Sequence, residues 1–440
     1  MPALEVLSQG QSPGSHTRGT NIMTLPAGFW KAFGPGLMWA AAAIGVSHLV
    51  QSTRAGAMAG FGLSGIIILA LVLKYPFFAF GPQYAAATGR SLVEGYRRIG
   101  SWALWLYFLM QLVTGVIHQV AILLLMAYLI QLAFGIDSPV WVIGGLLYAG
   151  CATWLAVGRF RGLDYAIKLV VAVLAVSTLI AAAIAAPRAD FSSLSLWPGA
   201  ATAVPLGFFL ALVGFMPAPI EMSVMSSLWT LEKERLHKRR TSVALAGLDF
   251  KIGYVGTGVL ALAFLLLGAA VLQGSGEQFS AAGAVFSGQL VDLYTNAFGE
   301  ATRPLVLVAV LTTVFSTTLI VIDGFPRAID RCVKNLGGRE EPRHDAPIGR
   351  SYWVTVIAFG VLNVIGLSLF TSSLTPMIDF ATIFTFATAP VLGYLNVRVI
   401  TSDDMPRELQ PRAGMLILAY VGLLALSGTT VVYLISRVAG

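Results

Sequence analysis

The sequence predicts an all-α membrane protein with about eleven transmembrane helices. Of its 440 residues, 57% are hydrophobic and only 11% are charged, and the mean hydropathy is +0.79. A soluble protein of this length would need far more charged surface. Apolar stretches long enough to cross a bilayer as a helix recur along the chain from residue 34 onward. Composition and spacing together therefore predict a helical bundle embedded in lipid.

The expected segments set the domain organisation. They are 34–60, 62–88, 101–132, 138–157, 164–186, 202–227, 242–273, 302–330, 351–370, 374–399 and 412–436. Residues 1–30 are rich in Ser, Gly and Thr and lack the apolar core of a signal peptide, so we expect a disordered cytoplasmic tail. Residues 31–440 are expected to form a single transmembrane domain, with 412–436 as an extra helix at its end.

Lys and Arg residues predict the orientation. They gather before the first segment and after every even-numbered segment, whereas Arg188 and Arg303 lie on the opposite side. The positive-inside rule then places the N-terminus in the cytoplasm and the C-terminus outside a plasma (inner) membrane. The same loops account for the net charge of +7. The expected partner is thus the lipid bilayer, with neither a nucleic acid nor an obligatory protein partner.

The first segment has a polar middle that lipid would not tolerate. Gly45, Ser47, His48 and Arg54 lie at its centre, between an apolar run and a run of small residues. Polar and charged groups at this depth face a site or a path inside the bundle. We therefore expect two half-helices flanking a break near Gly45, the arrangement that transporters use to direct helix ends at a substrate.

The sixth segment, 202–227, repeats this feature. Pro217 and Pro219 each lack a backbone donor and clash with the preceding turn, so the helix should unwind near residues 216–218. Interruptions in segments 1 and 6 predict two inverted five-segment repeats with a site at their interface. The two repeats are expected to span about 33–186 and 202–400.

Several motifs resemble those of the Nramp-type transporters of divalent metals. They are Gly34-Pro35, Ala55-Gly56-Ala57, Gly60-Phe61, Met216-Pro217, Asp323-Gly324-Phe325 and the stretch from Ala387 to Pro390. The spacing around the first break also agrees with that family. The resemblance implies the LeuT fold, in which segments 1–5 and 6–10 form the inverted repeats and segments 1 and 6 are broken. It also implies secondary active transport of a small inorganic ion.

The chain departs from the family at the metal ligands. Gly45 to His48 occupies the place of the family's Asp-Pro-Gly-Asn, and Ala218 replaces a histidine, so that Met216 alone remains of the side-chain ligands. A divalent ion stripped of water needs carboxylate or imidazole ligands. We therefore expect the usual transition-metal site to be lost. His48, Arg54 and the N-termini of half-helices favour a small anion, such as bicarbonate.

The residues expected to contact this substrate come from both breaks and from segment 10. They are Gly45, Val46, Ser47, His48, Arg54, Phe215, Met216, Pro217, Ala218 and Thr385. An alternative for Arg54 is a structural ion pair with an acid such as Glu221 or Asp379, because charges inside a membrane are usually paired.

Segment 8 offers a site for a coupling ion. Thr313, Ser316 and Thr317 are three and four residues apart, on one helix face. In sodium-coupled carriers of the LeuT fold, a hydroxyl pair with this spacing joins carbonyl groups of broken segment 1 around sodium, and the resemblance implies the same role here, with Gly45. The alternative is that these hydroxyls only hydrogen-bond between packed helices. Sodium symport without any other cofactor is the expectation.

Two other functions stay open. The first alternative is a transporter of a divalent ion such as Mg or Mn, using Met216, Glu221 and backbone carbonyls. The second is a membrane receptor or sensor that transports nothing. An enzyme is not expected, because the sequence contains no P-loop, no HExxH motif and no catalytic Ser-His-Asp pattern.

Overall fold

The computed structural model describes residues 33–45, 47–194, 204–272, 280, 283–338, 349–371 and 374–438, and its regular elements are all helices. The tail at 1–30 and Val46 lie outside the described residues. The first half contains α2 (Pro35–Ile44), η1 (Ser47–Ser52), α3 (Thr53–Ala59), α4 (Ser64–Thr88), α5 (Leu92–Ile99), α6 (Ser101–Phe134), α7 (Val140–Ala185), η2 (Ala186–Arg188) and η3 (Phe191–Ser193). The second half contains α8 (Leu206–Phe215), α9 (Met222–His237), α10 (Val243–Leu272), α11 (Gly283–Phe298), η4 (Glu300–Thr302), α12 (Arg303–Leu336), α13 (Arg350–Leu369), α14 (Leu374–Ile400), η5 (Arg407–Leu409) and α15 (Ala413–Val438).

The eleven expected membrane segments all have counterparts. Among the described residues, nine stretches are helical, long and apolar enough to cross a membrane. The other two segments are the interrupted ones: α2 is followed by η1 and α3, and α8 is followed by α9 after a non-helical stretch at 216–221. The protein is therefore an integral membrane protein with two broken helices, as the sequence predicts.

The two breaks differ in form. The second is an open stretch, as expected from its two prolines. The first is much shorter, because the chain resumes at Ser47 as a π-helix that runs directly into α3. A π-helix has one more residue per hydrogen-bonded ring than an α-helix and is found mostly at functional sites.

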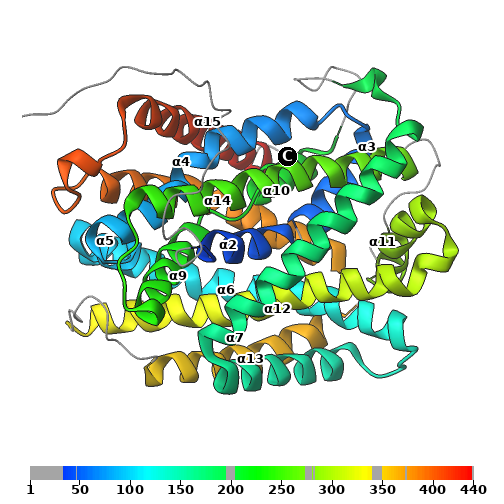
Figure 1. Cartoon of the computed structure of the whole chain (residues 1–440), viewed down its shortest axis with the longest axis horizontal. Coiled ribbons are helices and arrows are strands. Elements are labelled where there is room, and N and C mark those ends of the chain that lie inside the picture. Colours follow the sequence, from blue (N-terminus) through cyan, green and yellow to red (C-terminus); the bar gives the residue numbers. More distant parts are fainter. Residues whose placement is uncertain are drawn as a thin grey trace, which may run out of the picture.

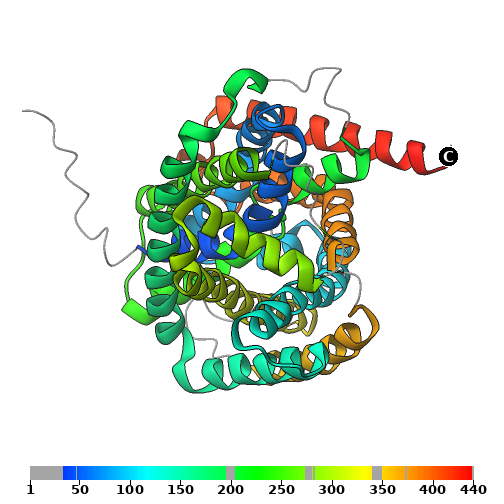
Figure 2. The same ribbon diagram turned by 90° about the vertical axis from the view of Figure 1, so that its right-hand side faces the viewer.

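Segments 4 and 5 also differ from the expectation. The sequence predicts two helices with a cytoplasmic loop between them, but α7 runs through both as one helix of 46 residues. No proline occurs between residues 140 and 185, so nothing in the connection forces the helix to end. Figures 1 and 2 show that the two halves of α7 run in different directions along the outside of the bundle.

The helix α2 lies at the centre of the bundle (Figure 1), and most of its residues are buried. Pro35 starts it, where the missing N–H costs nothing. Asp249 of α10 caps it: its carboxylate accepts hydrogen bonds from the N–H groups of Gly34 and Gly36 at 3.0 and 2.7 Å. A negative charge at a helix N-terminus is stabilising. Position 36 must be glycine, because a Cβ there would lie 2.2 Å from the Asp249 carbonyl oxygen.

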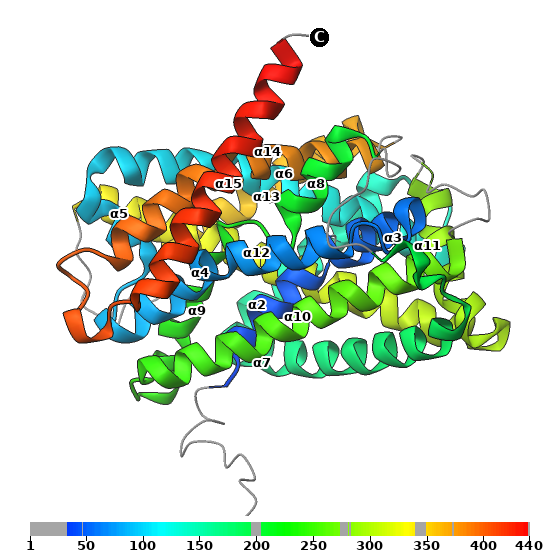
Figure 3. The same ribbon diagram turned by 90° about the horizontal axis from the view of Figure 1, so that it is seen from above.

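The packing follows the inverted repeat. The second helix of each half packs on the broken segment of the other half: α4 contacts α8 and α9, and α10 contacts α2 and α3. The long helices α6 and α12 pack against each other beside this centre. The last helix, α15, lies at the periphery, and Figure 3 shows its C-terminal end projecting from the bundle. The two breaks are thus enclosed by helices from both halves.

Candidate ion-binding site

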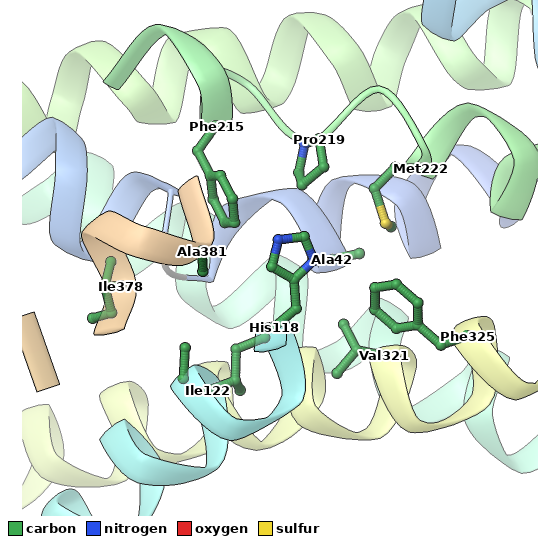
Figure 4. A pocket seen from close by; sticks show the side chains of 11 residues that line it. Ala42, His118, Ile122, Phe215, Pro219, Met222, Val321, Phe325, Ile378 and Ala381 are labelled. Carbon is green, nitrogen blue, oxygen red and sulfur yellow. The ribbon is translucent and has the colours of Figure 1, made fainter. Parts of the chain in front are cut away.

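A small cavity lies between the second break, α6, α12 and α14. Its volume is about 30 Å³, and its walls are formed by Ala42, His118, Ala121, Ile122, Phe215, Pro219, Met222, Val321, Phe325, Ile378 and Ala381. A cavity needs roughly 10–15 Å³ to hold one water molecule, so this one suits a solute of only a few atoms. His118 is the one ionisable residue among these lining residues. Figure 4 shows its ring reaching from α6 towards Phe215, Pro219 and Met222.

His118 connects three elements of the site. Its Nε2 lies 2.8 Å from the hydroxyl of Thr385 on α14, and its Nδ1 lies 3.2 Å from Oε1 of Glu221. The edge of its ring also packs against Phe215, with ring centroids 5.1 Å apart. Since neither His118 nor Glu221 is more than 5% exposed, their interaction is little screened by solvent.

Glu221 ends the non-helical stretch of the second break. It directly precedes Met222, the first residue of α9, so the positive end of the α9 dipole lies at the cavity wall. Oε1 of Glu221 is buried and makes no hydrogen bond that meets the geometric criteria. The imidazole of His118 is nevertheless close to it, with Nδ1 3.2 Å away. The His118 imidazole and Met222 therefore line this small space, and the Glu221 carboxylate contacts it only through His118.

His48 is fully buried beside the first break, but it does not line this cavity. Its Nε2 lies 2.9 Å from the carbonyl oxygen of Thr257 on α10, and its Nδ1 lies 2.7 Å from the Ser47 hydroxyl and 3.0 Å from the Ala43 carbonyl. Both ring nitrogens thus have protein partners. In this arrangement His48 joins the first break to α10.

Gly45 lies next to Thr317 of segment 8. A Cβ at Gly45 would lie 2.7 Å from Cγ2 and 2.8 Å from Oγ1 of Thr317, so only glycine allows this approach. The Thr317 hydroxyl donates to the carbonyl of Ala41 at 2.9 Å. The neighbouring Ser316 hydroxyl donates to the Thr313 carbonyl at 2.8 Å. The Thr317 hydroxyl of α12 therefore meets the carbonyl end of α2, where the dipole of that helix is negative, whereas the Ser316 hydroxyl bonds within α12.

Arg54 forms the structural ion pair that the sequence leaves as an alternative. Its guanidinium lies 2.7 Å from Oδ1 and 3.4 Å from Oδ2 of Asp379 on α14, and it donates to Gln51 at 3.2 Å. It also covers the ring of Phe208 on α8 at 4.9 Å. Arg54 thus ties α3, α8 and α14 together away from the cavity lining.

Of the other residues expected to contact the substrate, some lie at the cavity and some lie away from it. Phe215 lines the cavity and Thr385 borders it through His118. Met216 is buried in a separate apolar cluster with Phe61 and Leu265, and Ala218 is buried outside the lining. Sequence reasoning missed the cavity residues Pro219 and Met222. A signal was present, because Glu221 directly precedes Met222 in an interrupted membrane segment.

A dedicated metal centre is not evident in the part of the chain that the structure describes. No group of three or more His, Cys, Asp and Glu side chains there is arranged to hold a metal ion. Divalent ions such as Mg and Mn prefer carboxylate and carbonyl oxygens. Glu221 is a carboxylate in direct contact with the cavity residue His118.

Comparisons with known structures define the class of protein. The fold is similar to a crystal structure of a mutant of the Eremococcus coleocola manganese transporter, with a TM-score of 0.71 and 15% identity, covering 95% of this chain and 90% of that one. It is also similar to MhsT in complex with L-phenylalanine, with a TM-score of 0.57 and 15% identity, covering 90% of this chain and 98% of that one. The chain therefore has the fold of these transporters, the LeuT fold.

Sequence comparisons give the family. The Natural resistance-associated macrophage protein-like (Nramp) family model matches residues 36–436. The chain is 36% identical over 412 residues to uncharacterized protein PM0681 of Pasteurella multocida (strain Pm70), with 92% of each chain covered. This chain belongs to the Nramp family.

Proposed function

We propose that this protein transports a small anion, such as bicarbonate, together with sodium. The observation that carries the proposal is the close approach of Thr317 to Gly45. The Thr317 hydroxyl of α12 meets the carbonyl oxygen of Ala41 near the end of α2. Uncharged oxygen ligands suit a hard monovalent cation and are too few and too weak for a transition metal. Sodium would lie between Gly45, Thr313, Ser316 and Thr317.

The cavity beside His118 is the proposed place of the anion. Its volume of about 30 Å³ admits a solute of a few atoms and excludes an amino acid or a nucleobase. The N-terminus of α9 at Met222 and the Thr385 hydroxyl favour negative charge there. The Glu221 carboxylate lies 3.2 Å from His118 and is not among the residues that line the cavity, so it does not face the proposed anion directly. His48 would act at the edge of the site by fixing the first break.

The Arg54–Asp379 pair is the proposed closure on the outer side. It joins α3 of the first broken segment to α14, and both side chains are partly accessible, at 13% and 28%. Alternating access moves one group of helices against the other around a central site. A pair that is close to solvent can open and reform at low cost. We propose that it separates when the substrate enters.

Flux measured with purified protein in liposomes tests the proposal. We expect uptake of radiolabelled bicarbonate to depend on an inward sodium gradient, with no uptake when choline replaces sodium. Empty liposomes correct for the permeation of carbon dioxide. Sodium-independent uptake would remove the proposed coupling. Binding of bicarbonate without flux would instead favour a receptor or sensor.

A divalent metal ion is the second candidate substrate. The observation that favours it is the Glu221 carboxylate beside His118, which lines the cavity together with Met222. Carboxylate, imidazole and thioether groups together are metal ligands. In this alternative Met222 takes the place that the sequence assigns to Met216. Calorimetry with Mn²⁺ and Mg²⁺ distinguishes the two: stoichiometric binding that is lost in Glu221→Gln favours the metal.

A further inference from the structure

Lys74 lies in the middle of α4, inside the bundle, and is only 1% exposed. Its Nζ is 3.2 Å from the carbonyl oxygen of Val213, 2.8 Å from that of Gly214 and 3.0 Å from that of Ala218. It also lies 5.9 Å from the centre of the Phe78 ring. A charged amine buried at this depth needs several good partners, and Lys74 has them.

The three carbonyls all belong to the second break. Val213 and Gly214 are in the last turn of α8, where carbonyl groups lack helical partners and carry the negative end of the dipole. Ala218 lies in the non-helical stretch between Pro217 and Pro219, which have no N–H to offer. An ammonium has three N–H donors, so its charged form matches three acceptors. Lys74 thus neutralises the end of α8 and bridges it to the unwound stretch.

We propose that Lys74 acts as a tethered cation that holds the second break in its working shape. The carbonyls that it binds flank Phe215 and Pro219, which line the cavity. The ammonium performs at this break what a bound inorganic cation performs at a cluster of carbonyl oxygens, but it cannot leave. Lys74 is therefore a positioning residue for the cavity wall. This role does not depend on which ion the protein transports.

The proposal predicts chemical rescue. Lys74→Ala leaves the carbonyl groups facing a space in which a primary alkylammonium ion can replace the lost side chain. We expect liposome uptake of the ion that the wild type transports, radiolabelled bicarbonate or Mn²⁺, to fall at least tenfold in Lys74→Ala and to recover at least threefold with millimolar propylammonium. Tetramethylammonium is the matched control, because it has the same charge but no N–H to donate. Lys74→Met, which fills the space without charge, should lose flux and gain nothing from either ion.

A second readout is independent of transport. Propylammonium should raise the thermal midpoint of purified Lys74→Ala with increasing concentration and should not raise that of the wild type, since a ligand stabilises only a protein that binds it. If Lys74→Ala does not fold, Lys74→Met is measured alone. Flux within twofold of wild type in Lys74→Met would overturn the proposal. Folded Lys74→Ala that neither regains flux nor gains stability with propylammonium would overturn it as well.

Discussion

Valine at position 317 removes one hydroxyl and keeps the shape of the side chain. The Thr317 hydroxyl donates to the Ala41 carbonyl at 2.9 Å, so Thr317→Val loses one buried hydrogen bond, which contributes about 0.5–1.5 kcal/mol to stability. If the same oxygen is a sodium ligand and contributes about 1.4 kcal/mol or more, the half-saturating sodium concentration rises about tenfold or more. The effect on sodium should therefore exceed the effect on folding.

Thr317→Ser is the matched control for this experiment. It keeps the hydroxyl and removes Cγ2, the atom nearest to the position of a Cβ at Gly45. Uptake of bicarbonate into liposomes is measured at several sodium concentrations for both variants. We expect Thr317→Ser to keep the sodium dependence of the wild type, with a loss of about 1 kcal/mol of stability from the missing methyl group. Equal sodium dependence in Thr317→Val and wild type would refute the assignment.

Three further predictions concern charged groups. Arg54→Gln and Asp379→Asn should each increase labelling of cysteines introduced on the outer side about fivefold, since a partly exposed pair contributes about 1 kcal/mol to the closed state; labelling equal to wild type would contradict this. Glu221→Gln and His118→Gln should each reduce flux at least tenfold, because each single change leaves an unpaired buried group. The loss of flux in the double variant, expressed as a free energy, should be smaller than the sum of the losses in the two single variants. Additive losses would contradict the coupling. Burial raises the pKa of Glu234 to about 7, so its contribution to stability is present at low pH and is lost as the pH rises through 7. From pH 5 to pH 8 the wild type should therefore lose about 1–2 kcal/mol more stability than Glu234→Gln, with solvent screening allowed for. The thermal midpoints of the two proteins, measured at both pH values, check this.

The membrane-spanning helices and the two breaks could be predicted from the sequence because lipid allows few backbone conformations. A run of about twenty apolar residues in a membrane forms a helix, and two prolines only two residues apart, Pro217 and Pro219, favour an interruption more strongly than the single prolines inside α12 and α14 do. The same rules could not reveal the continuity of α7. Charged residues between two apolar runs indicate that they leave the lipid, but they do not indicate whether the helix ends there.

The site was harder to predict because it depends on which side chains face each other across helices. The resemblance implied a sodium site between Gly45 and the hydroxyls of segment 8, and Thr317 lies next to Gly45 in the structure. His48 was expected in the site, but its partners are the carbonyls of Thr257 and Ala43. Position in a break shows that a polar side chain is inside the bundle. It does not show whether another backbone group already binds that side chain.

The contact between α2 and α10 determines which parts of the transporter travel together. A Cβ at Gly253 would lie 2.2 Å from the Gly36 carbonyl oxygen, and Asp249 binds the start of α2 through two N–H groups. Backbones in direct touch cannot slide past each other, so α10 must accompany α2 in any rocking movement. The same close approach occurs at α3, where a Cβ at Gly56 would lie 2.0 Å from the Leu265 carbonyl oxygen of α10. Both halves of the first broken segment are therefore held by α10, and we expect α2, α3 and α10 to move as one body.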